Sequence, residues 1–222
     1  MDELLLIDKP SGMTSFDVIR ALRREYAALG SRAPKMGHAG TLDPLASGLM
    51  LIGAGEGTKW LGEYLKLPKT YEAVVRLGES RTTGDLEGEV VTESEPCDIS
   101  QGLITSTLED MKGMLTLPVP RYSAIKQGGE ALYKKARRGE EVAVPEKAME
   151  VRGAQLHSVE QIETDRGRRL DAKITFDVES GTYIRSLAEE LGRRLGVPTT
   201  LAALRRTQIG AFRVEDARSI RH

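Results

Sequence analysis

A twelve-residue run constrains this chain more than any other feature. Residues 37–48 are Gly-His-Ala-Gly-Thr-Leu-Asp-Pro-Leu-Ala-Ser-Gly. The three glycines permit backbone conformations and close approaches that other residues resist, and Pro44 restricts both its own φ and the conformation of Asp43. The run therefore predicts a rigid loop that presents one carboxylate and leads into a strand at 49–52. Taken alone, an Asp-Pro pair also fits an ordinary turn or a helix cap.

Length and composition set the outer limits. The chain has 222 residues and is 40% hydrophobic, which is enough for one large domain or two small ones. It contains no apolar stretch of membrane-spanning length and no signal-peptide pattern, so we expect a cytoplasmic protein. The single cysteine, Cys97, cannot form an internal disulfide, and the three scattered histidines offer no metal-ligand spacing. We therefore expect no metal and no cofactor.

The net charge of −1 hides a strong segregation of charge along the chain. Residues 82–111 contain eight acidic residues and no Lys or Arg, whereas 121–138 carry a net charge of +5 and 190–222 a net charge of +4. Basic surface is thus available for a nucleic acid, whose phosphates Lys and Arg neutralise. Charge alone equally favours solvated helix faces.

The first part of the chain alternates apolar runs with turn residues. A run over 4–7 predicts a buried strand, and Thr14 or Ser15 predicts the start of a helix that continues to about Leu29 and ends at Gly30. The apolar face of this helix is predicted to be Phe16, Ile19, Leu22 and Tyr26.

A second helix is predicted from Thr58 to about Leu65. Its buried residues are predicted to be Trp60, Leu61 and Tyr64. Alternation over 71–77 and 89–92 predicts two strands paired around a turn at 84–88.

The remainder is predicted to contain three helices and three strands. The helices are 100–112, 131–138 and 184–195, and the strands are 151–161, 170–179 and 201–209. The segment 121–145 is polar and basic, which is typical of a mobile excursion from the core. Because strands adjoin in hairpins more often than they alternate with helices, we predict an α+β fold with a mixed, largely antiparallel sheet.

The run at 37–48 matches every fixed position of G-H-x-G-x-L-D-P-x-A-x-G, and it resembles the catalytic signature of the TruB family of tRNA pseudouridine synthases. Further blocks resemble family motifs in the same order, so that the resemblance covers about residues 4–210. These blocks are Asp8–Ser15, Lys69–Tyr71, Tyr122–Lys126, Gly181–Arg185 and Leu204–Thr207. The resemblance implies the pseudouridine synthase fold.

The resemblance also implies catalytic roles. Asp43 corresponds to the nucleophile, which attacks either the sugar or the base of the target uridine. Tyr71 corresponds to the active-site tyrosine, which stacks on the base and takes part in proton transfer. Arg185 corresponds to the arginine that pairs with the nucleophile and keeps it ionised.

Four further residues correspond to family positions that bind or support the substrate. His38 enters the RNA stack at the place that the extruded uridine leaves, and Tyr183 and Leu204 form walls of the uracil pocket. Lys9 supports the active-site loop from the neighbouring segment.

The chain departs from the family pattern in two respects. Most bacterial members continue into a small C-terminal RNA-binding domain, whereas this chain ends at His222. The family commonly has Asp at the positions of Thr82 and Glu87. We therefore assign no catalytic role to this turn beyond a weak hypothesis for Asp85. We therefore expect one catalytic domain over 1–222, with a basic insertion at 121–145 that covers bound RNA and with no C-terminal RNA-binding domain.

These features together lead to the expectation of a stand-alone, monomeric enzyme that isomerises the T-arm uridine at tRNA position 55 without a protein partner or a membrane. A guide-RNA-dependent catalytic subunit is one alternative, although such homologues use the C-terminal domain that is missing here. A non-catalytic tRNA-binding module or folding chaperone is another, although it would not need Asp43, Tyr71 and Arg185 together.

Overall fold

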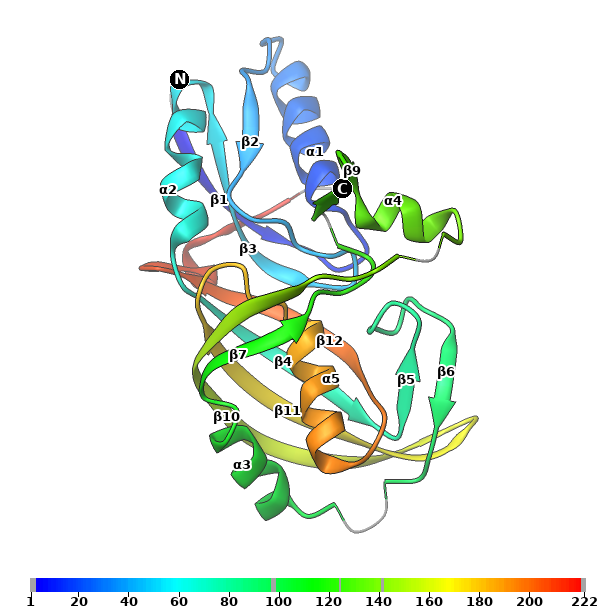
Figure 1. The fold of residues 1–222 in the computed structure, drawn as a ribbon. Helices are drawn as coiled ribbons and strands as arrows, with labels where there is room; N and C mark the ends of the chain where they lie inside the picture. Colours follow the sequence, from blue (N-terminus) through cyan, green and yellow to red (C-terminus); the bar gives the residue numbers. More distant parts are fainter. Residues whose placement is uncertain (1–2, 97–98, 124, 141, 221–222) are drawn as a thin grey trace. The chain divides into compact units, whose positions relative to one another are not determined.

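The computed structural model describes residues 3–96, 99–123, 125–140 and 142–220 (Figure 1). The chain divides into two compact units, residues 1–72 with 203–222 and residues 73–202. Strands β4 (Lys69–Leu77) and β12 (Thr199–Ile209) contribute to both units. Each unit is described by itself, and the expectation of a single catalytic domain stays a prediction.

The first unit is a sheet with helices at its side (Figure 1). Its elements are β1 (Glu3–Lys9), α1 (Ser15–Ala28), β2 (Met36–His38), β3 (Ser47–Ala54), the 3₁₀ helix η1 (Gly55–Trp60), α2 (Leu61–Lys66), β13 (Phe212–Arg213), the 3₁₀ turn η2 (Val214–Asp216) and β14 (Arg218–Ser219). The strand order is β14-β1-β3-β12, with β2 paired to β3 and β13 to β12. The β1–β3 pair is antiparallel, whereas β1–β14 and β3–β12 are parallel.

The first unit forms where the sequence predicts it. The strand predicted at 49–52 is confirmed as β3, which lies between β1 and β12 in the sheet and is buried from Gly48 to Ala54. The predicted helix is confirmed as α1, which a reciprocal pair of hydrogen bonds between Thr14 and Asp17 caps. Gly30 ends this helix with a φ of +70°.

Two burial predictions in this unit are wrong. The buried face of α1 is Ser15, Val18, Ile19 and Leu22, so Phe16 lies off that face and is 55% exposed. Trp60 is 63% exposed, because residues from Gly55 wind as a 3₁₀ turn and α2 begins only at Leu61. Thr58 donates to the carbonyl of Gly55 and does not cap α2.

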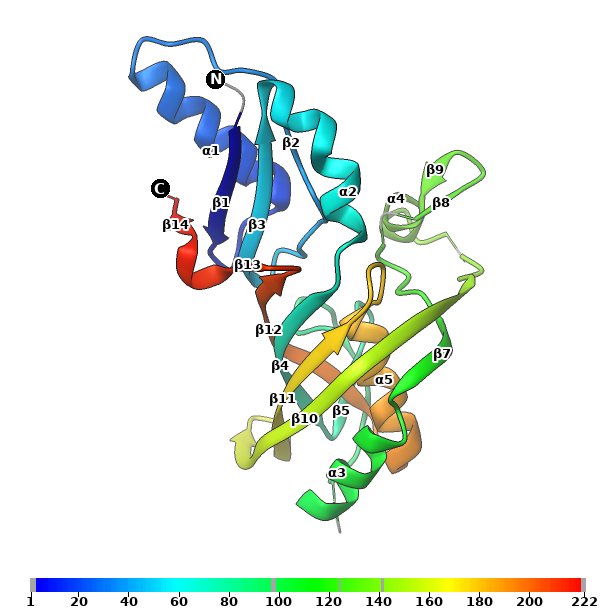
Figure 2. The same ribbon diagram turned by 90° about the vertical axis from the view of Figure 1, so that its left-hand side faces the viewer.

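The second unit combines a twisted sheet with two packed helices. Its elements are β5 (Glu79–Arg81), β6 (Val90–Glu93), α3 (Gln101–Glu109), β7 (Gly113–Pro118), β8 (Lys126–Gln127), β9 (Glu130–Ala131), α4 (Leu132–Arg137), β10 (Glu146–Thr164), β11 (Gly167–Val178) and α5 (Ile184–Leu195). The strand order is β12-β4-β11-β10-β7. Figure 2 shows β10 and β11 as one long antiparallel hairpin, and α5 contacts α3 and β7.

Most elements predicted for this unit are confirmed. The strand pair at 151–161 and 170–179 is observed as β10 and β11; β10 extends further at both ends, and β11 starts earlier than predicted. The helix at 184–195 is α5, and Gly196 ends it in the left-handed conformation. The helix at 131–138 is α4, although the short β8–β9 hairpin before it was not predicted. Together the elements make the predicted α+β fold with a mixed sheet.

One predicted strand pairing is wrong. The strand at 89–92 pairs with β5 and not with β4. Gly78 separates β4 from β5 at a φ of +111°, and its N–H donates to the carbonyl of Pro198. The β5–β6 hairpin is then fixed by buried charge, because Arg169 of β11 contacts both Glu79 and Glu93.

Candidate active site

The loop that carries Asp43 is tied to the segment that follows β1. The backbone N–H of Gly12 donates to the carbonyl of Pro44 at 2.8 Å, and the hydroxyl of Ser11 donates to the carbonyl of Leu45 at 2.8 Å. These bonds fix the backbone on the C-terminal side of Asp43.

Ser15, the first residue of α1, fixes the other side. The N–H of Leu42 donates to Ser15 Oγ at 2.8 Å, and Ser15 Oγ donates to the carbonyl of Leu42 at 3.1 Å. Both residues are buried, so water does not compete with these hydrogen bonds. Asp43 is therefore held between two anchored neighbours, Leu42 and Pro44.

The ammonium group of Lys9 lies below the same loop. Its side chain is fully buried, and Nζ donates to the carbonyls of Met13 at 2.6 Å, Pro10 at 3.0 Å and Pro44 at 3.5 Å. A buried cation requires such acceptors, because desolvation without them is costly. The geometry thus supports the role in loop support that the family resemblance implies for Lys9.

Gly48 ends the loop at a point where no side chain fits. Its φ is +107°, and a Cβ built there would clash with the backbone oxygen of Arg206. We expect Gly48→Ala to lower the free energy of unfolding by roughly 3–5 kcal/mol, because both the backbone conformation and the contact resist a side chain. Urea denaturation checks this value.

Gly30→Ala provides the matched control for that substitution. Gly30 also has a positive φ, of +70°, but nothing lies within 4 Å of the position that a Cβ would take there. Gly30→Ala should lower the free energy of unfolding by only about 1 kcal/mol, which is the penalty of the left-handed conformation. Equal costs at the two glycines would show that the contact with Arg206 is unimportant.

Three consecutive residues of β12, Arg205 to Thr207, connect this strand to other family-like sequence blocks of the first unit. Arg205 forms a bidentate ion pair with Asp8, with a shortest distance of 2.8 Å. Thr207 Oγ1 donates to the carbonyl of Thr70, next to Tyr71. The block therefore fixes β1 and the start of β4 relative to β3.

Arg206 lies between these two residues and points into the loop. It is 1% exposed, and its guanidinium donates to the carbonyls of Leu49 at 2.8 Å and Gly40 at 3.3 Å. Among the described residues, no carboxylate forms an ion pair with it. Arg206 thus places a full positive charge inside the loop that carries His38 and Asp43.

That charge acts on His38, the last residue of β2. Burial lowers the pKa of His38 below its usual value of 6.5, and the nearby charge of Arg206 lowers it further. The imidazole is therefore neutral at pH 7, which suits a ring that enters a stack of bases.

A pH dependence of stability follows from this shift. Because the pKa is lower in the folded state, the stabilisation from neutral His38 is complete above about pH 6.5 and is lost as the pH falls through the folded-state pKa. We expect the free energy of unfolding to fall more between pH 7.5 and 5.5 in the wild type than in His38→Asn. Parallel urea titrations at the two pH values check this, and identical pH dependences would contradict it.

Tyr71 and Leu204 lie in the same unit as Asp43. Tyr71 is on β4 and Leu204 on β12, and each is 9% exposed. This degree of burial fits pocket walls as well as ordinary packing, so their roles stay predictions.

Arg185 belongs to the second unit, at the start of α5. It is 5% exposed, and it donates to the carbonyls of Thr83 and Tyr122, both at 2.9 Å. The carboxylate of Asp85 lies 3.9 Å from Nε of Arg185. The guanidinium is therefore oriented from three directions.

Asp85 is itself fixed in its turn. Its carboxylate accepts from Thr83 Oγ1 at 2.5 Å and from the N–H of Glu87 at 3.1 Å. The backbone of Leu201 pairs with this turn on both sides of Asp85. The sequence supports only a weak hypothesis of a catalytic role for Asp85. With these contacts, the hypothesis becomes specific: Asp85 orients Arg185.

Tyr183 immediately precedes α5 and contacts Lys147 of β10. The ammonium group lies 5.6 Å from the centre of the tyrosine ring and donates to the carbonyl of Gly181 at 2.8 Å. Gly181 has a φ of +84°, and a Cβ there would meet Lys147 Nζ. Lys147 therefore fixes the turn that places Tyr183.

The structure thus groups the predicted site residues in two sets. Asp43, His38, Lys9, Tyr71 and Leu204 lie in the first unit, and Tyr183 and Arg185 lie in the second.

Sequence reasoning missed three residues that position the others, namely Ser15, Arg206 and Lys147. Ser15 and Arg206 lie inside family-like blocks, so block membership was the signal that could have identified them. Lys147 lies outside those blocks and gave no such signal.

In the part of the chain that the structure describes, no three His, Cys, Asp or Glu side chains form a group that could hold a metal ion. None of the helices among those residues is long and apolar enough to cross a membrane.

Comparison with known proteins first defines the class. A solved Cbf5–Nop10–Gar1 complex contains a chain that superimposes on this one with a TM-score of 0.71 and 25% identity, over 98% of this chain and 52% of that one. This chain therefore spans about half the length of that structural relative. The architecture is the pseudouridine synthase fold.

The particular family follows from sequence comparison. Residues 27–184 match the model of the TruB family pseudouridylate synthases, N-terminal domain. The tRNA pseudouridine synthase B of Arthrobacter sp. (strain FB24) is 39% identical over 217 residues, which are 98% of this chain and 69% of that protein. The enzyme of the same name from Thermobifida fusca is 39% identical over 220 residues, 99% of this chain and 73% of that protein. The chain belongs to the TruB family of pseudouridylate synthases.

Proposed function

We propose that this protein isomerises uridine to pseudouridine at position 55 in the T arm of tRNA. Its family and its curated relatives, which are named as tRNA pseudouridine synthases, support isomerisation of a tRNA uridine. The observation that carries the proposal is the anchored loop, in which hydrogen bonds with Ser15 and Gly12 fix the neighbours of Asp43 on both sides.

The reaction needs only the chemistry that a carboxylate supplies. The bond from N1 of uracil to the ribose breaks, the base turns, and a bond from carbon 5 to the ribose forms, while carbon 5 loses a proton and N1 gains one. Atoms and electrons balance without an oxidant or an energy source. Asp43 is proposed as the nucleophile that forms a transient covalent bond to the sugar or to the base.

The other predicted residues are proposed to prepare that attack. Arg185, which Asp85 orients, is proposed to keep Asp43 ionised, since a guanidinium favours the charged carboxylate. Tyr71 is proposed to stack on the base and to assist proton transfer.

Access to the base requires its extrusion from the RNA. A base inside a folded loop must be flipped out, and the gap in the stack must be filled. The neutral ring of His38 is proposed to fill this gap, with Tyr183 and Leu204 as walls of the uracil pocket. The fixed turn before Tyr183 supports the assignment of that residue.

We further propose that the protein acts as a cytoplasmic monomer without a guide RNA. The test is to incubate the purified chain with an unmodified tRNA transcript and to map pseudouridine at single-nucleotide resolution. Product at position 55 without additions is the expected result. Product that depends on an added guide RNA would support the guided catalytic subunit, and tight binding without product would support the non-catalytic tRNA-binding module.

A further inference from the structure

We propose that the outward side of α1 and the residues that follow it form an additional RNA-binding surface, which contacts tRNA phosphates away from the isomerised base. This surface, called the α1 track below, consists of Arg23, Arg24, Arg32 and Lys35. The inference rests on the proposed function, because it takes tRNA as the bound molecule.

The charge of the α1 track is available for a ligand. All four side chains are exposed, and among the described residues none of the four forms an ion pair. The nearby carboxylates are already engaged, since Asp17 pairs with Arg20 and Glu25 pairs with Arg218 at 2.8 Å. Four cations within thirteen residues therefore face solvent, and no carboxylate in the described part of the chain neutralises them.

Several exposed cations elsewhere in the chain differ in this respect. Arg138, in the basic segment at 121–138, contacts Glu130 and Glu140, both at 2.7 Å. Arg193, in the basic segment at 190–222, contacts Glu190 at 2.7 Å. A phosphate must displace a carboxylate at such positions, whereas at the α1 track it releases only condensed counterions, which is the favourable part of RNA binding.

The position of the track fits an RNA bound at the proposed catalytic loop. The first residue of α1, Ser15, is hydrogen-bonded to Leu42 next to Asp43. Arg23 and Arg24 lie about 12–14 Å further along the helix, at 1.5 Å per residue. This distance corresponds to roughly four nucleotides along one strand of a duplex. Arg23 and Arg24 therefore lie where the RNA strand that flanks a flipped nucleotide can pass.

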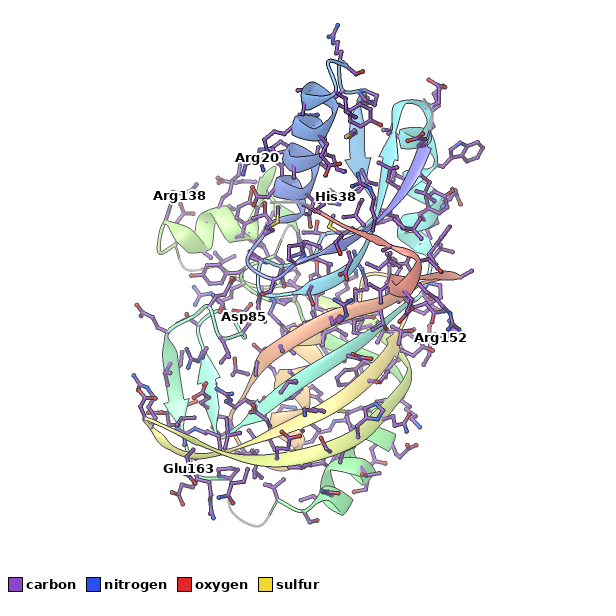
Figure 3. The ribbon with its side chains drawn as sticks, turned by 180° about the vertical axis from the view of Figure 1, so that it is seen from behind. Arg20, His38, Asp85, Arg138, Arg152 and Glu163 are labelled. Atoms are coloured by element: carbon purple, nitrogen blue, oxygen red, sulfur yellow. The ribbon has the colours of Figure 1, made fainter. Side chains whose placement is uncertain are left out.

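The near end of the helix adds an aromatic contact. Phe16 is 55% exposed, and the guanidinium of Arg20, labelled on α1 in Figure 3, lies 5.5 Å from the centre of its ring. Exposed aromatic and guanidinium groups together are typical of surfaces that bind unpaired nucleotides. An acidic protein would use the charges of the track but would not need this ring, so RNA fits the surface better.

The experiment compares two double variants that remove the same charge from the same unit. Arg23→Gln/Arg24→Gln removes two cations of the track, neither of which has an ion pair among the described residues. The matched control, Lys59→Gln/Lys66→Gln, removes two exposed cations that are paired with Glu56 and Glu63. Affinity for full-length unmodified tRNA is measured by filter binding from 50 to 200 mM KCl, and pseudouridine formation is measured in single turnover at saturating protein.

The track variant should bind about tenfold more weakly at 100 mM KCl, and the slope of log K against log salt should become shallower by about 1.4. Its single-turnover rate at saturation should stay within about twofold of wild type, and the control should match wild type in all three quantities. Arg23→Lys/Arg24→Lys should restore the slope, and thermal unfolding verifies that each variant is folded.

An unchanged slope in the track variant, or an equal change in the control, would overturn the proposal. An acidic protein as the true ligand would give the first of these results. If the wild type forms pseudouridine while the slopes are equal, only the α1 track is wrong. If the wild type binds tRNA without forming product, the proposed function fails, and the slopes still decide on the track.

Discussion

Asp43→Asn should reduce pseudouridine formation by roughly 10⁴-fold or more, as expected when an essential nucleophile is removed. The amide has nearly the same shape as the carboxylate but carries no negative charge. The hydrogen bonds that Gly12, Ser11 and Ser15 form with the backbone of Pro44, Leu45 and Leu42 do not use the side chain of Asp43, so they survive the substitution. Single-turnover assays on tRNA transcript measure the loss.

Binding and stability provide the controls for this variant. Its affinity for tRNA should stay within a fewfold of wild type, and its urea midpoint should change little. Asp17→Asn, which removes a carboxylate from the helix cap of the same unit, should lower stability and leave the chemical step intact. Activity of Asp43→Asn near the wild-type level would remove the basis of the proposed mechanism.

Arg185→Lys should slow the chemical step by about 10²-fold, because lysine keeps the charge but cannot reproduce the fixed fork of the guanidinium. In the structure that fork donates to two carbonyls, those of Thr83 and Tyr122, and faces Asp85. An ammonium group would leave part of this set unsatisfied and would move the positive charge. The loss should appear in the single-turnover rate at saturating protein and much less in tRNA affinity.

A second substitution at this position tests how much Arg185 contributes to the stability of the protein. Arg185→Met removes the cation beside a buried Asp85, and it should lower the free energy of unfolding by about 3–5 kcal/mol. The control is Arg193→Lys on the same helix, where the arginine is exposed and paired with Glu190, and it should change neither quantity. An Arg185→Lys enzyme as fast as wild type would show that the guanidinium geometry is unimportant.

The sequence predicted best those elements whose signals are local. The helix α5 has an amphipathic pattern and a glycine at its end, and the structure confirms its bounds. The apolar run at 49–52 predicted a strand that the structure confirms as the longer β3. Burial of single aromatic residues was less predictable, because a shift of one residue around a helix moved Phe16 to the surface. The partner of β6 depends on Gly78 and on charges of β11 that are distant in sequence.

The candidate site shows the same division. Asp43, His38 and Lys9 are candidates because they lie in short motifs that resemble those of the family, and their roles stay predictions. The contacts of the groups that surround them could not be predicted, because these contacts join residues that are far apart in sequence. Arg206 reaches Gly40 across 166 residues, and Arg185 reaches Thr83 across 102. Such contacts exist only after the strands have been placed.

The central claim is that this chain alone converts one defined tRNA uridine. The most direct measurement is the amount of pseudouridine per tRNA that the purified protein forms on two transcripts, which differ only by uridine or cytidine at position 55. The proposal predicts about one pseudouridine per molecule on the first transcript, located at position 55, and none on the second. Equal amounts on both transcripts, or none on either, would contradict it.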